Sequence, residues 1–76
     1  MSIVPQLVAR VVVATLIKAG FVITRQKGSH VFLKNHTTKR VTSVAMHSGN
    51  VKKGTLLAII KQAGLTLKQF RDLLKD

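Results

Sequence analysis

A short hairpin at the centre of the chain constrains the fold more than any other feature of the sequence. Residues 21–27 are rich in β-forming side chains, and residues 30–35 form a second such stretch. Gly28 and Ser29 stand between them and favour a tight turn. We therefore expect two strands that pair antiparallel across this turn.

The second strand of this hairpin has two different sides. Because side chains alternate along a strand, His30, Phe32 and Lys34 share one side, whereas Val31 and Leu33 share the other. Val31 and Leu33 look like the core side. His30 is therefore expected on the open side of the sheet or at its edge.

The segment before the hairpin has the pattern of a helix. Apolar residues recur at helical spacing over residues 5–19, with Pro5 suited to the first turn and Gly20 to the stop. The apolar run within it, residues 11–17, is far shorter than the roughly 20 residues that cross a bilayer, and no small-residue cleavage site follows it. We interpret it as mature structure, neither a signal nor a membrane anchor.

The segments after the hairpin complete the expected order of elements. Residues 40–47 predict a third strand, and residues 55–63 predict a helix that ends at Gly64. Thr66 and Gln69 fit a capping box that opens a last helix. The chain is thus expected to form one α+β domain over residues 1–76. A three-stranded antiparallel sheet with helices packed on one face is the compact solution.

Charge limits the chemistry that this chain can perform. It carries 13 Lys and Arg against two acids, Asp72 and Asp76, for a net charge of +11, and it has no Cys. Cys-type zinc sites, disulfides, thiol nucleophiles, carboxylate pairs and carboxylate-bound magnesium are therefore disfavoured. The expected partners, in order, are a nucleic acid, an acidic protein and a membrane surface. Since 46% of the residues are apolar, a disordered tail is a poor interpretation.

His30 is the leading candidate for catalysis, because histidine is the residue type that exchanges protons near neutral pH. Arg25 and Lys27 precede the turn and Lys34 follows on the second strand, so all three are candidates for phosphate binding, as is Ser29. A His beside fixed cations suits RNA cleavage without metal. The alternative is that His30 is a partly exposed strand residue, and spacing alone favours it.

The other candidates are weaker. His47, at the end of the third strand, is a possible accessory group, although a His in such a position is more often structural, and His36 lies in a polar turn. The three His do not have metal-ligand spacing, so no metal is expected. Lys52 and Lys53 precede a helix start, where free N–H groups attract phosphate.

Residues 59–74 also resemble a helix-turn-helix, which would make the chain a DNA-binding protein. The second helix of that pair offers few outward groups, namely Lys68, Gln69 and Arg71. A helical hairpin that packs on a sheet gives the same pattern. We favour packing.

Two runs resemble the HicA family of small toxins: GFVITRQKGSHVFLKN at residues 20–35 and MHSGNVKKGTLLAIIKQAGLTLKQF at residues 46–70. The resemblance implies a fold like the double-stranded-RNA-binding domain. It also implies a cytoplasmic ribonuclease toxin that cleaves messenger RNA, needs no cofactor and is neutralised by an acidic HicB-type antitoxin. The family's catalytic His falls on His30, which raises that residue to the favoured candidate.

The chain departs from the family pattern near the third strand. Ala45 stands where many relatives have Pro, and Asn50-Val51 stands where relatives often have an acidic residue. His47 with the following Ser-Gly matches the family, but we carry no catalytic role onto it. The leading hypothesis is a metal-independent endoribonuclease toxin. A non-catalytic RNA-binding module is the alternative, and a DNA-binding protein is the third.

Overall fold

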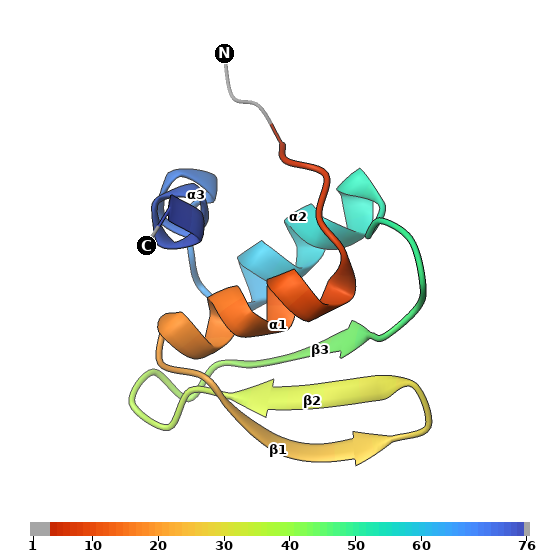
Figure 1. Ribbon diagram of the computed structural model, residues 1–76. Coiled ribbons are helices and arrows are strands. Elements are labelled where there is room, and N and C mark those ends of the chain that lie inside the picture. Colours follow the sequence, from red (N-terminus) through yellow and green to blue (C-terminus); the bar gives the residue numbers. More distant parts are fainter. Residues whose placement is uncertain (1–3, 76) are drawn as a thin grey trace.

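The computed structural model describes residues 4–75, which form three helices and three strands in the order α-β-β-β-α-α (Figure 1). This confirms the α+β fold predicted from the sequence, and it is consistent with the double-stranded-RNA-binding domain. The elements are α1 (Ala9–Lys18), β1 (Val22–Lys27), β2 (His30–Lys34), β3 (Val41–Ala45), α2 (Lys53–Gln62) and α3 (Leu67–Lys75).

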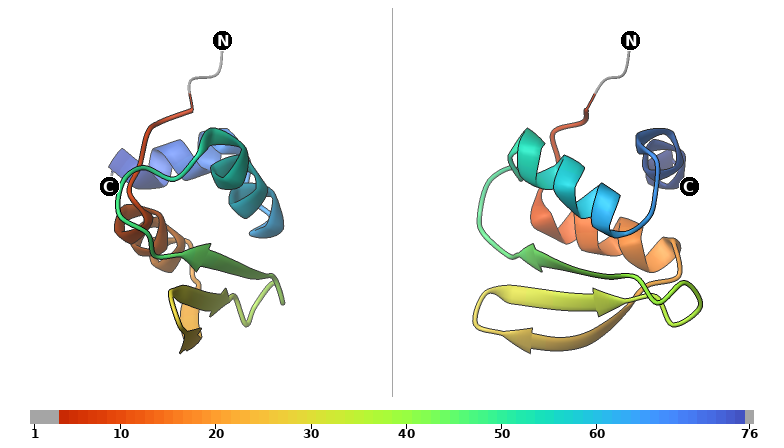
Figure 2. Two further views of the ribbon diagram at one scale, coloured as in Figure 1. Left: turned by 90° about the vertical axis from the view of Figure 1, so that its right-hand side faces the viewer. Right: turned by 180° about the vertical axis from the view of Figure 1, so that it is seen from behind.

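The three strands form one antiparallel sheet in the order β1-β2-β3, with the helices on one side (Figures 1 and 2). β3 lies nearest to the helices and β1 farthest from them. The sequence therefore predicted the layers correctly, because an amphipathic strand pattern needs a cover on one side.

The core lies between the sheet and the helices. Val31 and Leu33 of β2 are 5% and 0% exposed, as the alternation predicted. The helices contribute four large, fully buried side chains, Val12, Leu16, Leu56 and Phe70, and Phe21 and Val44 complete this set. Burying each of these side chains stabilises the fold by roughly 1.5–3 kcal/mol relative to exposure.

The first helix begins later than the sequence pattern predicted. Pro5 lies before the helix, and Val8 is extended with φ −81° and ψ 156°. The backbone here bonds elsewhere: the Val51 N–H donates to the Leu7 carbonyl at 2.7 Å, and Val8 forms a bridge with Asn50. The predicted start at Pro5 was wrong, because these long-range bonds hold the segment extended.

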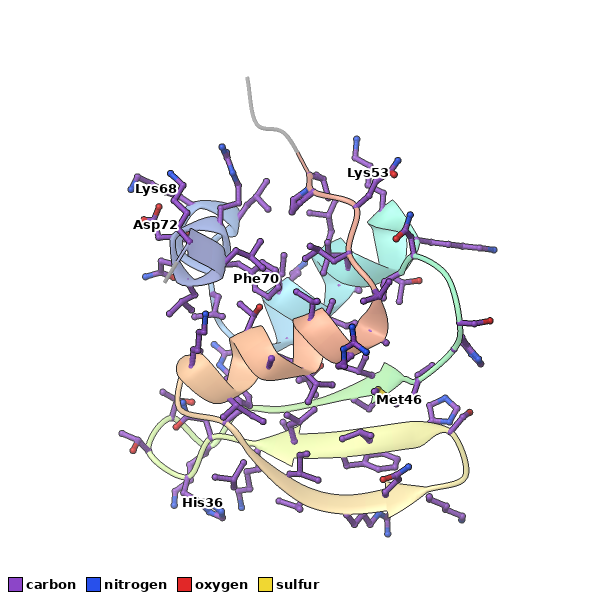
Figure 3. The ribbon with its side chains drawn as sticks, in the orientation of Figure 1. His36, Met46, Lys53, Lys68, Phe70 and Asp72 are labelled. Atoms are coloured by element: carbon purple, nitrogen blue, oxygen red, sulfur yellow. The ribbon has the colours of Figure 1, made fainter. Side chains whose placement is uncertain are left out.

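The last helix begins with the predicted capping box. The Gln69 N–H donates to the Thr66 hydroxyl at 3.0 Å, and the Thr66 N–H donates to the Gln69 side-chain oxygen at 2.8 Å. α3 packs against α1 and α2 through Phe70, which points into the helical layer (Figure 3). Its outer side carries Lys68 and Asp72. This arrangement indicates that the role of α2 and α3 is packing and not DNA recognition.

The helices leave one part of the sheet uncovered. α1 and α2 pack against β3, whereas all six residues of β1 are exposed. The β1–β2 hairpin therefore projects beyond the helical layer (Figure 2). None of the helices described in residues 4–75 is long and apolar enough to cross a membrane.

Candidate active site on the open face of the sheet

The sheet face that points away from the helices is called the open face here. Residues directly opposite each other in paired strands share a face, so the register defines this surface. It consists of three rows across β1, β2 and β3: Lys27, His30 and Ala45; Arg25, Phe32 and Ser43; Val22, Lys34 and Val41.

His30 is the first residue of β2 and directly follows a tight turn, which places it on the open face. Gly28 has φ 59°, a left-handed conformation that glycine adopts without strain. The Met46 N–H donates to the Ser29 carbonyl at 2.6 Å, which ties the turn to the end of β3. His30 is exposed, and its neighbour across β3 is the small Ala45. The imidazole is thus held on a paired strand and remains open to a substrate.

A β-bulge brings two cations to the same face as His30. The pairing of β1 with β2 shifts by one residue between Ile23 and Arg25. Without this shift, Thr24 would stand opposite Phe32; with it, Arg25 takes that place and Lys27 stands opposite His30. Bulges commonly re-aim side chains in this way beside functional sites.

The cations of the open face have no carboxylate beside them. Its nine residues include Arg25, Lys27 and Lys34 and no acid. The ion pair found within residues 4–75 joins Lys68 and Asp72 on α3, at 3.0 Å. The positive potential near His30 is therefore not neutralised by an acid on the same face, a setting that attracts a polyanion.

The predicted basic residues divide between two sides of the molecule. Lys52 and Lys53 stand at the start of α2, in the helical layer, and Lys53 extends away from the sheet (Figure 3). Lys52 caps the helix without a side-chain hydrogen bond, and the first turn of α2 carries no acid. These two lysines therefore lie outside the open face that holds His30.

The other two histidines also lie apart from the open face. His47, in the loop after β3, lines two cavities of about 340 and 260 Å³, and His30 lines neither. His36 lies in the β2–β3 turn, at the end of the sheet opposite Met46 (Figure 3). No group of three His, Cys, Asp or Glu able to hold a metal occurs among the residues described.

Phe32 belongs to the candidate site, although the sequence did not mark it as a site residue. Phe21 and Phe70 are 1% and 0% exposed, whereas Phe32 lies partly exposed on the open face. The Arg25 guanidinium carbon lies over its ring, 4.7 Å from the centroid. The strand alternation, which places Phe32 on the same side as His30, was the sequence signal that could have identified Phe32.

Comparison with protein families agrees with the resemblance seen in the sequence. Residues 9–65 match the family model for the HicA toxin of bacterial toxin–antitoxin systems. The chain belongs to the HicA toxin family. As a HicA toxin it is the toxin of a toxin–antitoxin system, and this implies an antitoxin partner. No curated protein matches the chain.

The HicA match covers α1, the whole sheet and α2, so it includes every residue of the open face. α3 begins at Leu67, beyond the matched segment. The part of the chain that carries His30 is thus the part that belongs to the HicA pattern, whereas α3 contributes Phe70 to the core.

Proposed function

We propose that this HicA toxin is a metal-independent endoribonuclease that cleaves messenger RNA in the cytoplasm, with His30 as general acid or base. One observation carries the proposal: His30 is exposed on a sheet face that holds three cations and no carboxylate. Family membership supports it, since the HicA family consists of toxins of toxin–antitoxin systems.

The reaction follows from the groups on this face. The ribose 2′ oxygen attacks the neighbouring phosphorus, and the bond from phosphorus to the 5′ oxygen breaks. The His30 imidazole accepts the proton of the 2′ hydroxyl or donates one to the leaving 5′ oxygen, and solvent water makes the other proton transfer. Lys27, directly opposite His30, and Arg25 in the next row stabilise the charge that gathers on the phosphate.

The remaining candidates would act on neighbouring phosphates. Lys34 stands four residues along β2 from His30, roughly 13 Å away at the rise of a strand. It is thus suited to a different phosphate from the one that is cleaved. Ser29 in the turn offers a hydroxyl beside His30. Lys52 and Lys53 would bind only RNA that extends to the helical side of the molecule. His47 would be an accessory group for such RNA.

The open face also suits the second partner, an acidic antitoxin of the HicB type. Val22 and Val41 flank Lys34 and are 45% and 55% exposed. Exposed valines gain nothing from a phosphate backbone, but a protein can bury them. An acidic antitoxin that covers these valines and the nearby cations would block access to His30.

Replacement of His30 by alanine tests the proposal. Removing a general acid or base costs about 10²–10⁴-fold in rate, so His30→Ala should abolish RNA cleavage and growth arrest. His36→Ala is the matched control, because it removes an exposed His at the other end of the sheet. Wild-type cleavage should persist in EDTA. Undiminished cleavage by His30→Ala would refute the assignment.

A non-catalytic RNA-binding module is the second candidate. One observation favours it: His30 is the single His among the nine residues of the open face, so no second imidazole completes an acid–base pair there. Purified protein incubated with RNA separates the candidates on a gel, because a binding module leaves the RNA intact. Duplex DNA added as competitor tests the DNA-binding alternative in the same assay.

A further inference from the structure

We propose that Arg25 and Phe32 together form a stacking site for one unpaired nucleobase, beside the position at which His30 acts. The base would lie on the outer side of the Arg25 guanidinium, whose inner side rests on the Phe32 ring. The proposal extends the proposed function, because it states how the RNA is held, and its test does not depend on cleavage.

The geometry of the pair supports this site. Arg25 and Phe32 are directly opposite in the β1–β2 register, and the guanidinium carbon is 4.7 Å from the ring centroid. Phe32 follows His30 by two residues on the same face, a rise of roughly 7 Å along the strand. Phe32, which supports the Arg25 guanidinium, and His30 are therefore neighbours on the same side of β2.

The pair has the chemistry that binds bases. A guanidinium is planar and weakly hydrated, and it stacks both on aromatic rings and on nucleobases. Arg25 is exposed, and no carboxylate within residues 4–75 pairs with it. Phe32 restricts the long Arg25 side chain to the sheet surface, which lowers the entropy that a base must overcome on binding.

The bulge at Thr24 is what creates the pair. Uninterrupted pairing would place Thr24 opposite Phe32, and a threonine offers no planar surface. Instead the Thr24 hydroxyl donates to the Phe32 carbonyl at 3.3 Å, and Arg25 comes over the ring. The register shift thus places Lys27 where it can bind a phosphate and Arg25 where a base can stack on it.

A stacking site of this kind selects the form of the RNA. In a duplex both faces of each base are covered by neighbouring base pairs, so only an unstacked base can lie on Arg25. The site would therefore bind single-stranded RNA, or a loop, in preference to double-stranded RNA of the same length. Stacking alone distinguishes poorly among the four bases.

The test uses the full chain carrying His30→Ala, so that the RNA stays intact. Short single-stranded RNAs with 2-aminopurine at successive positions are titrated with this protein, and the quenching of fluorescence on stacking is followed. We expect strong quenching at one position. Adding Phe32→Leu removes the ring on which the Arg25 guanidinium rests. The quenching should therefore fall, and binding should weaken by up to roughly 5- to 150-fold, the equivalent of the about 1–3 kcal/mol that a stacked base contributes.

Two conservative variants separate stacking from charge and from folding. Phe32→Tyr should retain the quenching, because it keeps an aromatic ring. Arg25→Lys keeps the charge but loses the plane, so the quenching should disappear while the salt dependence of binding remains. Lys68→Arg is the matched control on α3, outside the open face, and should leave the quenching unchanged. Thermal melts confirm that each variant is folded.

Several results would overturn the site. These are absence of quenching at every position, quenching that survives both Phe32→Leu and Arg25→Lys, and equal competition by double-stranded RNA. Failure of the proposed function looks different: His30→Ala would then cleave RNA as the wild type does, or the wild type would not cleave at all. If the wild type does not cleave, the quenching data decide the stacking site as they stand. If His30→Ala still cleaves, the same titration is made with 2′-O-methyl RNA, which has no 2′ hydroxyl to attack the phosphorus.

Discussion

The two faces of β2 show how one strand serves stability and function separately. Val31 and Leu33 point toward the helices and are almost fully buried. His30, Phe32 and Lys34 alternate with them and remain exposed or partly exposed. Because a strand has a period of two, the core side chains and the site side chains are neighbours in sequence but point in opposite directions.

This difference explains how the site can be both exposed and well positioned. The buried side chains of β2 fix the strand against the helical layer, so the backbone that carries His30 cannot shift freely. β1 has no such anchor, since all its residues are exposed. Its position depends on pairing with β2, and substitutions on the open face should therefore change activity with little change in stability.

The largest expected effect is on the buried side of β2. Leu33→Ala removes a fully buried side chain, so the free energy of unfolding should fall by about 2–5 kcal/mol. Lys34→Ala, its neighbour on the open face, should change it by no more than about 0.5 kcal/mol. Chemical denaturation of both variants measures the contrast. A comparable loss in the two would show that the faces are not independent.

The second-largest expected effect is on the salt dependence of RNA binding, and it is tested by comparing two pairs of cations. Replacing Arg25 and Lys27 by Gln removes two charges from the open face, and replacing Lys52 and Lys53 by Gln removes two from the start of α2. If the open face binds RNA, the first change should lower the slope of log affinity against log salt by about 1.4, since each single-strand phosphate contact contributes roughly 0.7. The second change should lower it less.

Binding titrations of single-stranded RNA over a range of salt concentrations provide this measurement. The two double variants have the same net charge, so any difference between their slopes reports position rather than total charge. Equal decreases in slope would mean that the RNA also crosses the helical side of the molecule. A larger decrease for the α2 pair would place the main interface there and contradict our choice of the open face.

The smallest expected effect is a change in stability with pH that arises on α3, outside both faces of the sheet. A hydrogen bond from Lys68, and the positive charge of that residue, lower the pKa of Asp72. A carboxyl group whose pKa is lower in the folded state stabilises the fold above its unfolded pKa, and this contribution is lost as pH falls through the folded pKa. Asp72 is exposed, so solvent screens the interaction and the effect should be slight.

Thermal melts from about pH 6 down to about pH 2 test this last prediction. Asp72→Asn should melt slightly earlier than the wild type near pH 6, and the two melting temperatures should converge in acid. Lys68→Gln is the matched control, because it removes the other partner and should have the same pH dependence. A difference that grows as pH falls would have the wrong sign and would contradict the lowered pKa.

Much of this fold follows from local patterns. The Gly28-Ser29 turn, the alternation in β2 and the Thr66–Gln69 capping box are each set by residues close in sequence, and the structure confirms all three. The start of α1 could not be predicted in this way. Its first residues bond to the loop before α2, and a helical pattern contains no information about such a distant partner.

The sequence by itself determined which side chains of β2 face the core and which face outward, and it carried the motifs of the HicA family. It did not determine what surrounds His30. Counted from Val22 at the start of β1, simple alternation would turn Arg25 and Lys27 toward the helices. The one-residue shift at Thr24 turns them to the open face instead. Register belongs to a pair of strands and not to either strand alone, so only the tertiary structure could decide it.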